Sequence, residues 1–183
     1  MTLKDLHIDN TWTLFLDRDG VINKKLEDDY VKHTTEFEFI DGTLNALRML
    51  APLFKTIVVV TNQQCIGKKI IFPQDLDLIH QNMMYEINYL KGRIDKIYHS
   101  PYLAIENHPT RKPSIGMALQ AQQDFPHINF AKSIIVGDSI SDMEFGRNAG
   151  MKTVYISPEV KVDERIDFNF RSLIYFAHNL TTQ

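Results

Sequence analysis

The chain has 183 residues, of which 44% are hydrophobic and 23% are charged, and its formal net charge is −3. This composition is ordinary for a soluble globular protein, and it gives no electrostatic reason to expect nucleic-acid binding, which calls for a basic face. The single cysteine, Cys65, excludes an internal disulfide framework and a cysteine-rich zinc site. No stretch approaches the ~20 apolar residues of a membrane span, and the N-terminus has no signal-peptide run. We therefore expect a cytoplasmic protein without a membrane partner, whose oligomeric state the sequence leaves open.

Five short runs rich in Val, Ile and Tyr are mostly continuous rather than alternating, which is typical of strands buried on both faces of a parallel sheet. In chain order they are residues 12–17, 55–62, 94–100, 132–138 and 152–157. Segments with helical signals follow them in turn, at residues 43–54, 74–91, 114–124, 141–149 and 171–180. Gly92 is expected to stop the second helix, and Ser141 with Glu144 to form a capping box at the fourth.

This alternation predicts a doubly wound, Rossmann-like α/β fold, with a parallel sheet of about five strands and helices on both faces. We expect one domain over residues 1–183, in which residues 158–183 form a C-terminal tail or helix.

Polar residues stand where three of the predicted strands end. The first strand ends in Asp17, the second in Thr61 and Asn62, and the fourth in Gly137 and Asp138. Ligands of open α/β sheets bind beyond the carboxyl ends of the strands. These residues are therefore expected to meet at one site.

Asp17 and Asp19 lie two residues apart, so in an extended segment their side chains point the same way and repel. A divalent cation would compensate, and Mg²⁺ prefers carboxylate oxygens. Asp138 is a candidate further ligand, and Asp142 could support the metal directly or through water. A hairpin is the alternative, because Asp-Gly between apolar residues is a strong turn signal. A calcium loop is rejected, since its sixth position needs glycine and here holds Ile22.

Three weaker signals accompany the aspartates. Thr61 and free amides at its strand end could hold a phosphate oxygen, and the Arg111-Lys112-Pro113 segment before a helix offers a compact cation. The segment GDSISD could be a metal-binding turn or a plain helix start. It could also carry a serine nucleophile at Ser139, although no aspartate stands three residues before His178.

Four motifs together resemble a known family. DRDG, VVVTN, RKP and GDSISD resemble, in order and spacing, the motifs of the haloacid dehalogenase superfamily of phosphatases. FLDRDGVIN, DDYVKHTTEFEFIDGT, VVVTNQ and RKPSIGM are similar to the histidinol-phosphatase and D,D-heptose 1,7-bisphosphate phosphatase group within it. The similarity covers roughly residues 12–157. The gaps between the motifs are too short for a separate cap domain.

The resemblance implies a role for each motif residue. Asp17 would be the nucleophile that forms an aspartyl-phosphate, and Asp19 the general acid and then the base, which needs a proton near neutral pH. Thr61 and Lys112 would hold the phosphoryl group, as positioning and charge neutralisation require. Mg²⁺ would be bound by Asp17, the backbone carbonyl of Asp19, and Asp138, with Asp142 in support. The implied substrate contacts are Gly20, Asn23, Asn62, Gln63, Arg111 and Ser139.

The chain departs from this group at three places. The group carries a zinc loop with three cysteines and a histidine before RKP, whereas here Ser100, Tyr102 and Thr110 stand at expected ligand positions and only His108 could bind a metal. We therefore expect no structural zinc, and we expect His99 and His108 to be ordinary surface residues. In addition, Gln64 and Cys65 replace the Ser-Gly of TNQSG, and Ser139 replaces a lysine that is common in heptose enzymes.

The motifs and the resemblance together imply a Mg²⁺-dependent phosphomonoester hydrolase of a small phosphorylated metabolite, and the resemblance points to a sugar phosphate such as D-glycero-D-manno-heptose 1,7-bisphosphate. Histidinol phosphate is the alternative substrate. A phosphoacceptor signalling domain is a hypothesis of another class, but its acceptor aspartate would follow the third strand, which here ends in Tyr98-His99-Ser100. A non-catalytic regulatory domain is a further hypothesis, although every catalytic residue type is present.

Overall fold

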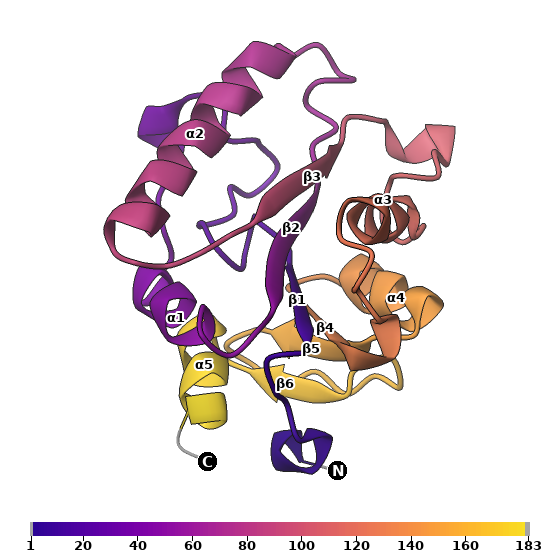
Figure 1. The fold of residues 1–183 in the computed structure, drawn as a ribbon. Helices are drawn as coiled ribbons and strands as arrows, with labels where there is room; N and C mark the ends of the chain where they lie inside the picture. Colours follow the sequence, from indigo (N-terminus) through magenta and orange to yellow (C-terminus); the bar gives the residue numbers. More distant parts are fainter. Residues whose placement is uncertain (1, 182–183) are drawn as a thin grey trace.

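Six parallel strands form one sheet in the order β3-β2-β1-β4-β5-β6 (Figure 1). The computed structural model describes residues 2–181. The strands are β1 (Thr13–Leu16), β2 (Thr56–Asn62), β3 (Lys96–Ser100), β4 (Ser133–Gly137), β5 (Lys152–Ile156) and β6 (Phe168–Phe170). The α/β class and the five expected strands are confirmed. The sixth strand was not predicted, because its three half-buried residues form no continuous apolar run.

Helices cover both faces of the sheet. The α-helices are α1 (Thr43–Leu50), α2 (Pro73–Tyr89), α3 (Gly116–Asp124), α4 (Ile140–Ala149) and α5 (Leu173–Thr181). Short 3-10 turns occur at Leu3–Leu6, Thr34–Glu36, Ala104–Glu106 and Phe130–Lys132. Helices α1, α2 and α5 lie on one face, and α3 and α4 lie on the other (Figure 1).

The core is divided between the two faces by the alternation of side chains along the strands. Leu14 and Leu16 of β1 pack in the cluster that includes α1, α2 and α5, whereas Phe15 between them packs in the cluster that includes α3 and α4. The same division holds in β2 for Val59 and Val60. Both faces are therefore buried, which explains why the strands read as continuous apolar runs.

Several predicted helix bounds are wrong in detail. Helix α1 ends at Leu50 rather than at residue 54, and α3 and α5 each begin two residues later than expected. Helix α2 ends at Tyr89, two residues before the expected end, and Lys91, with φ of 62°, takes the left-handed conformation just before Gly92. Helix α4 begins at Ile140 rather than at residue 141. Its cap is Ser139, whose N–H donates to the carboxylate of Asp142 at 3.0 Å, so the expected Ser141–Glu144 capping box does not form.

The C-terminal segment packs on the core instead of trailing from it. Strand β6 pairs in parallel with β5, and α5 buries Leu173, Phe176 and Ala177 against α1 and the sheet. Within residues 2–181, no helix combines the length and apolar character that crossing a bilayer requires.

Candidate active site

The carboxyl ends of β1, β2 and β4 open onto a cavity of about 320 Å³. Because Leu16 is in register with both Val59 and Val136, the residues that follow them lie together at the carboxyl ends of these three strands. Asp17, Thr61 and Asp138 all line this cavity, so the predicted convergence of the three strand ends occurs. A larger cavity of about 650 Å³ lies at Phe39–Leu44 and Tyr89–Lys91, away from these residues.

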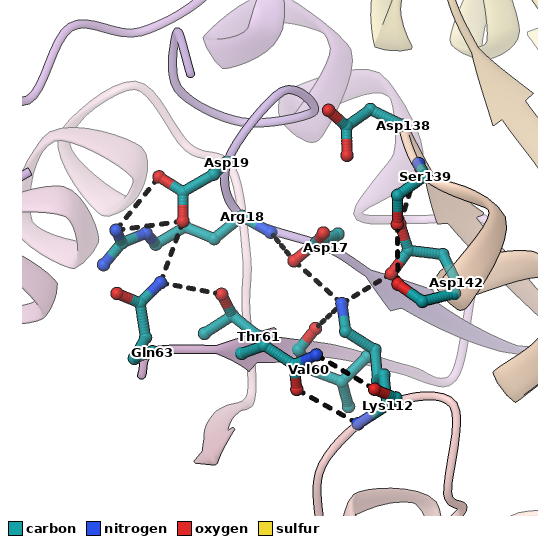
Figure 2. A network of polar contacts seen from close by, with 12 residues as sticks. Asp17, Arg18, Asp19, Val60, Thr61, Gln63, Lys112, Asp138, Ser139 and Asp142 are labelled. Carbon is teal, nitrogen blue, oxygen red and sulfur yellow. Dashed lines mark hydrogen bonds and ion pairs between the residues drawn. The ribbon is translucent and has the colours of Figure 1, made fainter. Parts of the chain in front are cut away.

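Lys112 is the centre of the site's polar contacts. Its ammonium group lies 2.9 Å from Asp17 Oδ1 and 2.6 Å from Asp142 Oδ1, and it donates to the Val60 carbonyl at 2.7 Å (Figure 2). Lys112 is only 3% exposed and Asp142 is fully buried. A buried cation with three oxygen partners is held in one position, which is what a phosphate-binding lysine needs.

The site carries more negative charge than Lys112 neutralises. Burial and the neighbouring Asp142 raise the pKa of Asp17 to about 7, although Lys112 opposes this shift. Burial alone would lower the pKa of Lys112, but Asp142 and Asp17 raise it above its ordinary value. Lys112 therefore stays a cation. The pKa of Asp17 is raised first by burial and then by the neighbouring carboxylates, and a bound cation would offset that repulsion.

The carboxylates of Asp17, Asp138 and Asp142 each place one oxygen within 4.8 Å of the others. Among the described residues, Asp138 Oδ1 is buried without a hydrogen-bond partner. Both oxygens of Asp142 are engaged, one by Lys112 and one by Ser139. Asp17 and Asp138 are thus the carboxylates best placed to hold a divalent cation, and their hard oxygen atoms fit Mg²⁺. Asp142 also belongs to this cluster, and it holds Lys112 and caps α4 as well.

Asp19 does not point with Asp17 toward the other carboxylates. Its oxygens accept hydrogen bonds from Arg18 Nη2 at 3.0 and 3.1 Å, Asn23 Nδ2 at 2.9 Å and Gln63 Nε2 at 2.8 Å. Although burial raises the pKa of Asp19, Arg18 and these donors lower it overall. The site as it stands favours the anion, which suits a general base; the protonated form expected for a general acid is not favoured here.

Gly20 makes room for Asp138. A β-carbon at Gly20 would lie 2.2 Å from Asp138 Oδ2, and its φ of +83° is one that other residues rarely adopt. Gly20 and Asn23 were both expected to contact substrate, but neither lines the cavity. Asn23 is fully buried and supports Asp19. These two residues lie behind the cavity lining, where Gly20 leaves space for Asp138 and Asn23 fixes the side chain of Asp19.

The residues at the carboxyl end of β2 contact the other motifs. Gln63 Nε2 bridges Asp19 and the hydroxyl of Thr61 at 2.8 and 2.9 Å. The amide of Asn62 pairs with the backbone of Lys112, donating to its carbonyl at 3.1 Å and accepting its N–H at 3.0 Å. Asn62 therefore braces Lys112, although it also lines the cavity with Gln63. The other expected substrate contacts, Arg111 and Ser139, line it as well.

Sequence reasoning missed three charged or titratable side chains at the site. Arg18 is 1% exposed and hydrogen-bonds through Nη1 to His80 Nε2 at 3.1 Å. Burial and Arg18 lower the pKa of His80 to about 3, so its ring is neutral and accepts this bond. Lys25, from the loop after β1, lies 2.8 Å from Asp138 Oδ2. The signal for Arg18 was a charge at the end of an apolar strand, which requires a partner when buried; no local signal marks His80 or Lys25.

His99 and His108 are half-buried, so the expectation of ordinary surface residues is wrong. The ring of His99 lies edge-on to His80 at 6.2 Å, and the ring of His108 stacks on Tyr102 at 3.4 Å. Both histidines are held by neighbouring rings.

Comparison with known proteins agrees with this geometry. The sequence profile described as polynucleotide kinase 3 phosphatase matches residues 13–183. A D-glycero-alpha-D-manno-heptose-1,7-bisphosphate 7-phosphatase of Campylobacter jejuni is 36% identical over 163 residues, which are 89% of this chain and 92% of that protein. A D-glycero-beta-D-manno-heptose-1,7-bisphosphate 7-phosphatase of Escherichia coli is 35% identical over 162 residues, covering 81% and 83%.

The fold matches solved structures as well. The D,D-heptose 1,7-bisphosphate phosphatase of B. bronchiseptica, complexed with magnesium and phosphate, has a TM-score of 0.84 and 24% identity, and the match covers 93% of this chain and 98% of that one. A parallel sheet with aspartates and a buried lysine at its central strand ends defines the haloacid dehalogenase class of phosphatases. The chain belongs to the phosphatase family of this class whose profile it matches, polynucleotide kinase 3 phosphatase. The resemblance of its motifs to this superfamily is confirmed.

Proposed function

We propose that the chain is a Mg²⁺-dependent phosphomonoesterase that removes the 7-phosphate of D-glycero-D-manno-heptose 1,7-bisphosphate. The observation that carries the proposal is the buried pair of Asp17 and Lys112 on the cavity floor, 2.9 Å apart. Relatives at 35% and 36% identity bear the name of this activity over more than four-fifths of the chain. They differ in the anomer that they name, so we propose the 7-phosphatase reaction without choosing between the alpha and beta sugars.

The chemistry would take place in two steps. Asp17 attacks phosphorus, the bond from phosphorus to the sugar oxygen breaks, and an aspartyl-phosphate forms. Asp19 gives a proton to the departing oxygen, then takes one from the water that attacks the aspartyl-phosphate and releases phosphate. Asp19 is an anion in the resting site, and the negative charge of an arriving phosphate would raise its pKa and favour its protonation. Lys112 and Thr61 hold the phosphoryl oxygens.

Asp17 and Asp138 would hold Mg²⁺, which supplies positive charge beside the transferring phosphoryl group. Asp142 keeps the ammonium of Lys112 beside Asp17 throughout. We also propose that residues 1–183 form one cytoplasmic phosphatase domain without a cap. Loops then provide the specificity, among them the segment with Lys25 and Tyr30 that lines the cavity.

The test is phosphate release from heptose 1,7-bisphosphate, both anomers, histidinol phosphate and hexose phosphates, with and without Mg²⁺. Position-resolved NMR of the product identifies which phosphate leaves. Asp17→Asn is expected to abolish release while the protein stays folded. Asp124→Asn is the matched control, because Asp124 pairs with Lys96 and Tyr98 away from the cavity. Retained activity in Asp17→Asn would refute the mechanism, and preference for histidinol phosphate would refute the substrate.

A further inference from the structure

The loop between β3 and α3 forms one wall of the cavity through Arg111. Its only regular structure is the 3-10 turn Ala104–Glu106. Contacts between its side chains stabilise the rest of the loop. Four of these side chains touch one another and are here called the loop cluster: Ser100, Tyr102, His108 and Thr110.

Hydrogen bonds connect three members of the loop cluster. The hydroxyl of Thr110 lies 2.8 Å from His108 Nδ1 and 3.2 Å from the hydroxyl of Ser100. The backbone N–H of Thr110 also donates to His108 Nδ1 at 3.3 Å, so this nitrogen is an acceptor. The Thr110 hydroxyl therefore donates to His108 and accepts from Ser100. Ser100 is fully buried, and its carbonyl accepts the N–H of Gln63 at 2.7 Å, which ties the cluster to the end of β2.

Stacking connects the fourth member. The rings of Tyr102 and His108 lie 3.4 Å apart and 12° from parallel. Arg111 is attached to both residues, since its Nη1 donates to the Tyr102 carbonyl at 3.0 Å and its N–H donates to the His108 carbonyl at 2.9 Å. The other N–H groups of this guanidinium have no partner within residues 2–181 and remain available to an anion in the cavity.

The same four positions do not fit a zinc ion. Zinc sites in proteins use thiolate, imidazole and carboxylate ligands. The loop cluster offers three neutral hydroxyl groups and one imidazole, and the Nδ1 lone pair of that imidazole already accepts hydrogen bonds from Thr110. Cys65 is buried in a different cluster, with Ile71 and Leu76.

We propose that the loop cluster replaces a metal ion as the element that orders residues 101–112, and that its members are positioning residues for Arg111. A metal-free chain of hydrogen bonds and one ring stack then does what a zinc ion does in the related group. The kinetic part of this proposal rests on the proposed function, but the metal content and the order of the loop do not.

The first experiment measures metal content and loop order. The full chain, produced in zinc-supplemented medium, is expected to hold well below one zinc per chain by elemental mass spectrometry. Chelation followed by Mg²⁺ alone should restore its full activity. Amides of residues 101–112 should exchange hydrogen faster in Thr110→Val than in the parent protein. One zinc per chain, or a requirement for added zinc, would overturn the proposal, as would unchanged exchange in Thr110→Val.

The second experiment measures KM and kcat on the preferred phosphate ester. Thr110→Val and His108→Leu should each raise KM by about fivefold, the effect of losing one or two hydrogen bonds that fix Arg111, while kcat stays close to the parent value. Thr110→Ser should restore KM. His127→Leu is the matched control, because His127 hydrogen-bonds to the Thr56 hydroxyl at 2.7 Å. Thr56 begins β2, so this bond lies at the amino ends of the strands, opposite the cavity. An unchanged KM would overturn the positioning role.

The two proposals fail in different ways. If the parent protein releases phosphate from no ester, the proposed function fails, and zinc content and hydrogen exchange still decide the role of the loop cluster. If the parent protein is active but holds zinc, only the loop cluster proposal fails.

Discussion

The floor and the rim of the cavity differ in how their charges are held. On the floor, Asp17 and Lys112 are at most 8% exposed, and Lys112 has three oxygen partners, one of which is the buried Asp142 behind the floor. On the rim, the side chain of Lys25 is 56% exposed and has Asp138 as its one ion-pair partner among the described residues. Arg111 likewise uses one N–H of its guanidinium.

We therefore expect the buried charges of the floor to carry out the reaction and the exposed charges of the rim to set substrate specificity. Buried, multiply paired charges are fixed before substrate arrives, and such preorganised groups stabilise a transition state effectively. Exposed groups with one partner can exchange that partner for a substrate oxygen at little cost. The floor is therefore expected to tolerate almost no substitution, whereas the rim can change with the sugar.

The largest effect is expected on the floor. Lys112→Met leaves Asp17 and Asp142 buried without their cation, which should lower the free energy of unfolding by about 3–5 kcal/mol and kcat by about 10²–10³-fold. Denaturant titration and steady-state kinetics measure both. Lys96→Met is the control, because its ion pair with Asp124 is exposed and should contribute at most about 1 kcal/mol. Equal losses in the two variants would show that the buried ion pairs of Lys112 contribute no more than an exposed surface pair.

An intermediate effect is expected behind the floor. Gly20→Ala forces a β-carbon toward Asp138 at a positive φ, so we expect a stability loss of about 1–3 kcal/mol and an activity loss of about 10²-fold from displaced site groups. Gly150→Ala separates the two causes, since Gly150 has φ of +82° but no atom within 4 Å of an added β-carbon. It should lose stability and keep activity. If Gly20→Ala also kept activity and Mg²⁺ affinity, the position of Asp138 would not matter.

The smallest effect is expected on the rim. Lys25→Met should change the free energy of unfolding by at most about 1 kcal/mol and raise KM by up to about fivefold, and the rise should shrink at high salt because exposed charges are screened. Lys24→Met is a matched control from the neighbouring residue, whose partner is Glu38 rather than a cavity residue. A large fall in kcat without a change in KM would place Lys25 on the floor instead.

The sequence predicts the sheet and the meeting point well, because both follow from local patterns. Continuous apolar runs indicate strands with both faces buried, and the carboxyl ends of parallel strands lie on the same side of the sheet. Asp17, Thr61 and Asp138 were therefore placed correctly at one cavity. The short strand β6 carries no such pattern, since its burial comes from pairing with β5 and from α5.

Side-chain direction and pairing were less predictable. Asp19 was expected to point with Asp17, but β1 ends at Leu16 and the chain turns at once, with the N–H of Ile22 donating to the Arg18 carbonyl at 2.8 Å. The alternation rule for extended chains no longer applies there. The pairing of Asp142 with Lys112 joins residues 30 positions apart and depends on how α4 and the RKP segment meet. No local pattern encodes such a contact.

The most direct test of the mechanism is to trap its covalent intermediate. The parent protein is mixed with its preferred phosphate ester and Mg²⁺, quenched in acid during turnover, and reduced with borohydride, which converts an aspartyl-phosphate to homoserine. Mass spectrometry of the peptides then locates the change. We predict homoserine at position 17 and none at Asp19 or Asp138. Reduction at another aspartate, or an unmodified protein under conditions of full turnover, would contradict the assignment of Asp17 as the nucleophile.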